Sequence, residues 1–111
     1  MENLYELIFC IVDAGFSDSV MTAVRETDSR IGGTVLNARG TAREEAEKLF
    51  NISIQPEKEI VMILVKKDIK EDILHAIYRK VPGQRIAFSM PVDDVVGLST
   101  PVASIQPKPE E

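Results

Sequence analysis

An α+β fold, in which an antiparallel sheet carries two helices on one face, is predicted by three features of this sequence. Four apolar segments rich in strand formers and two segments with apolar residues at helical spacing follow in the order strand, helix, strand, strand, helix, strand. Gly and Pro residues separate several of these segments. The length of 111 residues allows one domain with one core. This order is that of the split β-α-β, or ferredoxin-like βαββαβ, arrangement.

The first half of the chain is expected to hold two strands and a helix. Residues 4–12 are too few for a membrane span and rich in strand formers, so they predict the first strand. Ser17 is predicted to be the N-cap of the helix that follows, and the pair Gly32 and Gly33 lies beyond its end. Residues 33–39 predict the second strand.

The second half repeats the pattern. Residues 59–66 are a continuous apolar run between charges, which predicts a strand buried on both faces. Asp68 and Glu71 have the spacing of a capping box, so a helix is expected to begin at Asp68 and to end at a Pro-Gly turn. Residues 86–90 predict the last strand, which Pro91 is expected to end.

The first and third strands carry apolar side chains in both registers, so both faces of the sheet need to be covered. The two helices cover one face, and a chain of this length has no further element for the other. Large contiguous apolar surfaces are rare on soluble monomers, so self-association through the sheet is the simplest explanation. The strand pattern therefore predicts an oligomer.

Composition argues against several classes of protein. With 44% hydrophobic and 28% charged residues and a net charge of −5, a general nucleic-acid or anionic-membrane surface is not expected. Cys10 is the only cysteine, which excludes an intrachain disulfide, and its apolar strand predicts a buried, inert thiol. The sequence shows no secretory signal and no run of about 18 apolar residues, so we expect a cytoplasmic protein without membrane insertion.

No constellation of catalytic or metal-binding residues stands out, so an enzyme is not expected. His75 is the only histidine and has no second zinc ligand near it, which predicts a surface or interface position. Asp93 and Asp94 are adjacent on an extended segment and would point to opposite faces, so we expect a solvated strand exit.

Two separated segments carry a family resemblance. Thr34, Val35, Gly40 and Arg43 occupy the places of a Gly-x-Thr-Val pattern followed by Gly-x-x-Arg. The segment from Phe88 to Val92, with the spacing Phe-x-x-Pro-Val, precedes two acidic residues. In both respects, and over most of residues 4–98, the chain resembles the P-II family of nitrogen-regulatory signalling proteins.

This resemblance implies a homotrimer that binds ATP or ADP in clefts between subunits and regulates a target protein such as a transporter or a metabolic enzyme. The corresponding ligand-binding residues are Thr34, Gly40, Arg43, Leu64, Gly83, Gln84 and Arg85. Arg43 can hold phosphate bidentately, and Arg85 lies in a turn whose backbone N–H groups can help. Each also has an ordinary interpretation, since both arginines can be solvated surface residues and Thr34 a simple strand residue.

The sequence departs from the P-II pattern at three places. The connection from Arg43 to Ile60 is several residues shorter than the usual T-loop and lacks the modifiable tyrosine, so uridylylation is not expected. The Gly-Asp-Gly-Lys phosphate loop is replaced by residues 81–85, and the two C-terminal arginines fall at Gly97 and Ser99. A triphosphate would lose several partners, so the identity of the effector stays open, and a ligand-free trimeric interaction module is the alternative.

The connection of residues 41–59 resembles a T-loop and is expected to bind the target protein. Its first part is helix-forming over residues 43–50. The stretch of residues 49–54 carries four large apolar residues, which either contact a target or pack onto their own trimer: Leu49, Phe50, Ile52 and Ile54. Residues 1–98 are expected to form the domain, and residues 99–111 a Pro-rich extended or disordered tail.

Overall fold

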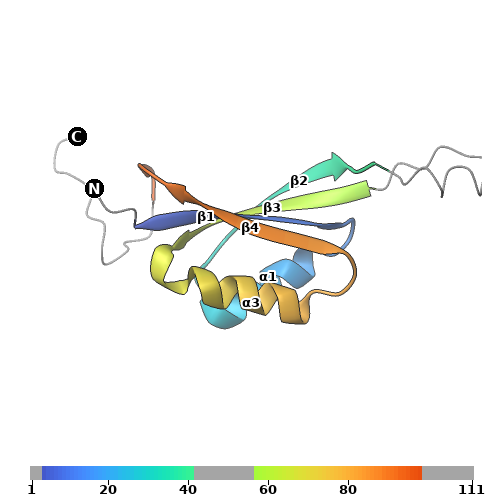
Figure 1. Cartoon of the computed structure of the whole chain (residues 1–111), viewed down its shortest axis with the longest axis horizontal. Helices are drawn as coiled ribbons and strands as arrows, with labels where there is room; N and C mark the ends of the chain where they lie inside the picture. Colours follow the sequence, from blue (N-terminus) through green and yellow to red (C-terminus); the bar gives the residue numbers. More distant parts are fainter. Residues whose placement is uncertain (1–3, 42–56, 99–111) are drawn as a thin grey trace, which may run out of the picture.

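The computed structural model describes residues 4–41 and 57–98. A four-stranded sheet forms one layer, and two helices form the other, on one side of the sheet only (Figure 1). The elements are β1 (Tyr5–Asp13), α1 (Ser17–Thr27), β2 (Thr34–Arg39), β3 (Glu57–Lys66), the 3₁₀ turn η1 (Lys67–Ile69), α3 (Lys70–Lys80) and β4 (Arg85–Val92).

The strands lie in the order β2-β3-β1-β4, and every neighbouring pair is antiparallel. β1 and β3 are central, which agrees with their apolar composition, and β2 and β4 are the edges. Element order and topology confirm the predicted ferredoxin-like α+β fold with both helices on one face.

The core lies between the sheet and the helices because side chains alternate along each strand. β1 and β3 bury one register of side chains against the apolar stripes of α1 and α3. Fully buried side chains of this core are Ile8, Cys10, Val12, Val20, Val24, Val61, Ile63, Ile73 and Ile77. Burial of each large aliphatic side chain contributes about 1.5–3 kcal/mol. Cys10 is buried as predicted, and burial raises the pKa of its thiol to about 11.

The opposite register forms a second apolar face, which we call the open face. Neighbours across the strands lie in rows, with Phe9 opposite both Met62 and Phe88. The Phe9 and Phe88 rings are stacked, with centroids 5.6 Å apart and 7° between planes. The open face consists of Leu7, Phe9, Ile11, Thr34, Leu36, Ile60, Met62, Leu64, Ile86, Phe88 and Met90. These residues are half-buried or exposed in one copy of the chain, so the burial expected on both faces of β3 is realised on one.

Both predicted helix N-caps are wrong. α1 begins at Ser17 itself, with Phe16 at the N-cap position and no capping hydrogen bond from that side chain. α3 begins at Lys70, because the chain first passes through η1, where the Lys67 N–H donates to the Leu4 carbonyl. The predicted capping box at Asp68 is therefore replaced by a 3₁₀ turn.

Two strands are longer than predicted. β3 begins at Glu57, two residues before the apolar run. β4 begins at Arg85 and continues through Pro91, which lies opposite Glu6, to Val92. Proline is tolerated there because β4 is an edge strand, one side of which has no hydrogen-bonded neighbour among the described residues.

Several sequence-based expectations concern residues that the structure does not describe. The helix over residues 43–50, the four apolar residues of the 41–59 connection and the tail of residues 99–111 lie outside the described residues. Among the helices within residues 4–41 and 57–98, none has both the length and the apolar character needed to cross a bilayer.

Candidate functional site

Two segments of the predicted ligand site meet at one end of the sheet, which we call the loop end. The register places Ala38 opposite Lys58, and Lys58 opposite Asp13. Val12 lies opposite Arg85, so the turn before β4 is at the same end. The loop end therefore holds the exit of β2 toward Gly40, the start of β3 and the turn of residues 82–85.

Lys58 lies at the centre of the loop end. Its Nζ is 2.6 Å from Asp13 Oδ1 and 3.5 Å from Gln84 Oε1. The Lys58 side chain is only 16% exposed, so this ammonium group is largely committed to those partners. The hydrogen bond from Lys58, with a smaller contribution from the backbone of Gln84, lowers the pKa of Asp13. The Asp13 carboxylate is therefore ionised at neutral pH.

Glu59 joins the start of β3 to the start of α1. Its Oε1 accepts hydrogen bonds from the backbone N–H groups of Gly15 and Ser17, each at 3.1 Å. Hydrogen bonds from Ser17, first from its side chain and then from its backbone, lower the pKa of Glu59, and Gly15 adds to the effect. The first N–H groups of a helix lack partners within it, so a carboxylate from another strand satisfies them here. This contact explains why α1 needs no side-chain N-cap of its own.

Arg85 is bound to the end of α3. Its Nη2 donates to the Tyr78 carbonyl at 2.9 Å, and its Nη1 donates to the Gly83 carbonyl at 3.2 Å. The guanidinium carbon lies 4.6 Å from the centroid of the Tyr78 ring. Cations are favoured at helix C-termini, where carbonyl groups lack partners. The arrangement makes Arg85 a cap of α3, with its charge directed toward the protein's own carbonyl groups.

The turn before β4 requires glycine at position 83. Gly83 has φ +79°, and a Cβ there would lie 3.4 Å from Asp13 Oδ2. The backbone of the turn therefore passes close to the Asp13 carboxylate. This proximity completes a cluster of Asp13, Lys58, Gly83 and Gln84, which we call the Asp13 cluster.

One copy of the chain does not bring all predicted ligand-binding residues together. Thr34 lies opposite Met62, and Leu64 lies opposite Leu7, so both belong to the open face. Met62 is four positions along β3 from Lys58, which corresponds to about 13 Å in a strand. Gly40, Gly83, Gln84 and Arg85 are at the loop end, and Arg43 lies outside the described residues.

Sequence patterns alone do not identify three charged residues of the loop end, which are Asp13, Lys58 and Glu59. A signal was present, because charged residues flank the apolar runs of both strands. Once β1 and β3 are known to be antiparallel neighbours, the residue after the first run faces the residues before the third. Only the strand order and register show which of these charged residues lie opposite one another.

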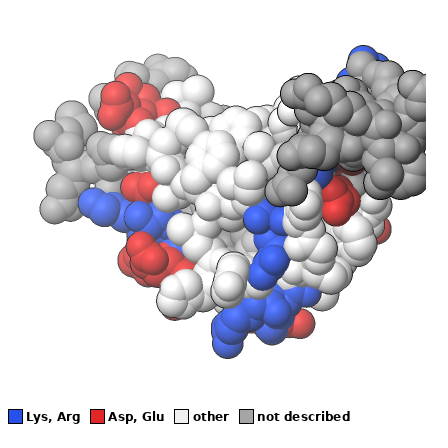
Figure 2. Space-filling model, turned by 45° about the vertical axis from the view of Figure 1, so that its right-hand side comes forward, with Lys and Arg blue, Asp and Glu red and all other residues white. Residues whose placement is uncertain are grey.

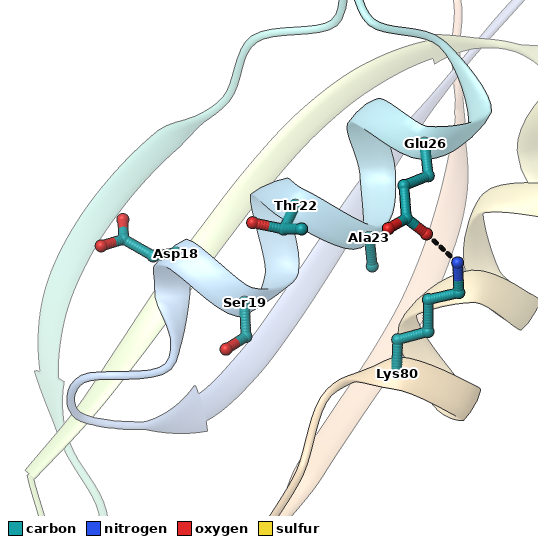
Figure 3. A pocket seen from close by; sticks show the side chains of 6 residues that line it. All are labelled: Asp18, Ser19, Thr22, Ala23, Glu26 and Lys80. Atoms are coloured by element: carbon teal, nitrogen blue, oxygen red, sulfur yellow. Dashed lines mark ion pairs between the residues drawn. The ribbon is translucent and has the colours of Figure 1, made fainter.

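A separate hollow of about 360 Å³ lies between α1 and α3 (Figure 3). An ion pair between Lys80 and Glu26 crosses it. Its lining residues are Asp18, Ser19, Thr22, Ala23, Glu26 and Lys80. None of these is a predicted site residue, and none belongs to the Asp13 cluster.

The remaining titratable candidates lie on the surface. His75, Asp93 and Asp94 are exposed, which agrees with a surface histidine and a solvated strand exit. Within the described part of the chain, no group of three or more His, Cys, Asp or Glu side chains could hold a metal ion. Figure 2 shows an uncharged area across the upper middle of the molecule, with most of the basic side chains below it.

Comparison with known proteins gives structural relatives only. No family model matches this sequence, and neither does any curated protein. The crystal structure of Arabidopsis thaliana PII bound to citrate matches with a TM-score of 0.64 at 24% identity, covering 89% of this chain and 84% of that chain.

Two other solved structures share the fold. A DUF3240 family protein from Shewanella baltica has a TM-score of 0.63 at 16% identity and covers 89% of this chain and 100% of its own. CutA1 from Pyrococcus horikoshii has a TM-score of 0.64 at 13% identity and covers 82% of this chain and 86% of its own. The chain therefore has the ferredoxin-like fold that its sequence predicts, and it shares this fold with a PII protein.

Proposed function

We propose that this chain is a cytoplasmic, non-catalytic regulatory protein of the P-II type. It assembles as a homotrimer, senses a small effector at clefts between subunits and regulates a partner protein through the 41–59 connection. An adenine nucleotide is the first candidate effector, and a transporter or metabolic enzyme, including one of nitrogen metabolism, is the expected partner. The observation that carries the proposal is the sheet with two apolar faces, only one of which is covered by residues 4–41 and 57–98 of the same chain.

The open face supports assembly. Four of its apolar residues remain exposed, namely Leu36 at 44%, Ile86 at 62%, Phe88 at 42% and Met90 at 38%. Residues of this kind continue across all four strands, so the apolar surface is contiguous. Soluble monomers rarely leave such a surface uncovered, and copies of the same face can cover one another.

The separation of the predicted ligand-binding residues supports a cleft between subunits. Thr34 and Leu64 belong to the open face, whereas Gly83 and Gln84 belong to the loop end. A compact ligand that contacts both groups would take them from different copies, because they lie about 13 Å apart along the sheet of one copy. Assembly through the open face is therefore a condition for the proposed effector site.

The position of the 41–59 connection supports its role in partner binding. It leaves β2 and enters β3 at the loop end, where Gln84 contacts Lys58 of β3. Phe50→Ala and Ile54→Ala are expected to leave the thermal midpoint almost unchanged and to abolish capture of the target. A stability loss of about 2–5 kcal/mol would instead place these side chains in a packed core.

A ligand-free trimeric interaction module is the second candidate function. The binding of Arg85 to the Tyr78 and Gly83 carbonyls favours it, because a guanidinium used in this way offers less to phosphate. The two candidates share the fold and the trimer and differ in effector binding.

A thermal-shift panel separates these two functions. Adenosine, AMP, ADP, ATP, cyclic dinucleotides, bicarbonate, citrate and 2-oxoglutarate are tested against the full chain. A ligand at 100 times its dissociation constant adds about 2.7 kcal/mol to the free energy of unfolding. The sensor function predicts a concentration-dependent rise of the midpoint with at least one compound, and a flat panel favours the ligand-free module.

A further inference from the structure

The turn of residues 83–85, which the proposed sensor function assigns to the effector, already lies against an anion from the same chain. Asp13 Oδ2 is within 3.4 Å of the Cβ position of Gly83, and Asp13 Oδ1 is 2.6 Å from Lys58 Nζ. The backbone of Gln84 helps to lower the pKa of this carboxyl, after the larger effect of Lys58. The surroundings of the Asp13 carboxylate, an ammonium group beside a glycine turn, are those that favour a phosphate.

The two cationic side chains near this turn, Lys58 and Arg85, already bind groups of the same chain. Lys58 is paired with Asp13, and its side chain is mostly buried. Arg85 donates to the carbonyls of Tyr78 and Gly83. A phosphate that entered the turn would have to displace the Asp13 carboxylate from Lys58 or lie beside it at an unfavourable distance between like charges.

The N-terminus of α1 also attracts anions at the loop end. A carboxylate of the same chain occupies it as well. Glu59 accepts the N–H groups of Gly15 and Ser17 there. Both features are therefore satisfied by carboxylates of the chain itself.

We propose that Asp13 is a specificity-determining residue, which occupies the 83–85 turn as an internal anion and selects against effectors that carry a polyphosphate. The inference rests on the proposed effector site and narrows its ligand to an adenine compound without a polyphosphate tail. It also assigns Lys58 a second role, since this ammonium group becomes a phosphate ligand when Asp13 loses its charge.

The test measures dissociation constants for ATP, tripolyphosphate and adenosine by calorimetry on the full-length protein. Asp13→Asn removes the internal anion, and Asp13→Ser does so with a smaller side chain in case the amide disturbs folding. Asp72→Asn is the matched control, because this exposed residue on α3 makes the same change in net charge away from the loop end. Light scattering establishes that each variant keeps the assembly of the parent.

The expected result is that Asp13→Asn or Asp13→Ser binds ATP at least about tenfold more tightly than the parent, or about 1.4 kcal/mol. Tripolyphosphate should follow ATP, adenosine should bind the parent and the variants alike, and Asp72→Asn should behave as the parent. Adding Lys58→Met to Asp13→Asn should abolish the gain.

Two outcomes overturn the inference and differ in what they say of the proposed function. If the parent binds ATP as tightly as the Asp13 variants, the selectivity assigned to Asp13 is wrong and the effector site stands. If neither adenosine nor ATP binds the parent or any variant, the adenine effector site is rejected together with the inference.

Discussion

Glu59 Oε1 accepts a hydrogen bond from the backbone N–H of Ser17, with 3.1 Å between the oxygen and the nitrogen. This contact joins the start of β3 to the first residue of α1. The two residues are 42 positions apart in the sequence. The bond explains why α1 has no local N-cap of its own, and it ties the start of β3 to the helical layer.

Glu59→Gln is expected to lower the thermal midpoint more than Glu71→Gln, an exposed control in the first turn of α3. The hydrogen bonds from Ser17 and Gly15 hold the pKa of Glu59 below its usual value of 4.5. Because the pKa is lower in the folded state, the stabilisation is present above pH 4.5 and is lost as the pH falls through the folded pKa. Thermal melts from pH 3 to pH 7 check this, and the midpoints of the parent and of Glu59→Gln should converge as the pH falls. A midpoint difference that grows on acidification would contradict the prediction.

Gly33→Ala is expected to destabilise the fold, whereas Gly32→Ala is not. A Cβ at Gly33 would lie 2.9 Å from Met21 Sδ and 3.3 Å from the Met62 carbonyl oxygen, and one at Gly32 would meet nothing within 4 Å. Overpacking of this kind costs about 1–3 kcal/mol. Denaturant unfolding of both variants makes the comparison, and equal midpoints would show that the two positions are equally open.

Met62→Glu and Ile63→Glu are adjacent substitutions with different expected outcomes. Ile63 is fully buried in the core, so a glutamate there is expected to unfold the chain, since an unpaired buried charge costs several kcal/mol. Met62 lies on the open face, so a glutamate there is expected to dissociate the oligomer into folded monomers. Circular dichroism and light scattering on both variants test the distinction, and an intact oligomer of Met62→Glu would contradict it.

Cys10 is expected to be unreactive in the native protein. Its thiol is fully buried, and burial raises the thiol pKa to about 11, so little thiolate exists at neutral pH. A chromogenic disulfide reagent should react with one thiol per chain in denaturant and with none in buffer. Rapid labelling of the native protein would show that β1 opens readily.

The sequence predicts the fold well where apolar periodicity decides the structure. The two central strands, the stripe of Ile73, Ala76 and Ile77 on α3, and the buried Cys10 follow from local patterns. Local patterns fail at the element ends. Ser17 and Asp68 look like caps, yet the tertiary contact from Glu59 and the 3₁₀ turn at Lys67 determine where the helices begin.

The candidate site is less accessible to sequence reasoning, because its contacts join residues far apart in the chain. Arg85 looks like a phosphate ligand in the sequence, and only the structure reveals its bonds to the carbonyls of Tyr78 and Gly83. The pairing of Asp13 with Lys58 likewise depends on the antiparallel register of β1 and β3.

The central claim, that three copies cover one another's open faces, is tested most directly by the mass of the full-length protein in solution. Multi-angle light scattering after size exclusion should give three times the 12.3 kDa mass of the chain at micromolar concentration. Met62→Glu should shift that mass to a single chain with the helical signal retained. A monodisperse monomer of the unmodified protein would contradict the account, because the open face would then be exposed to water.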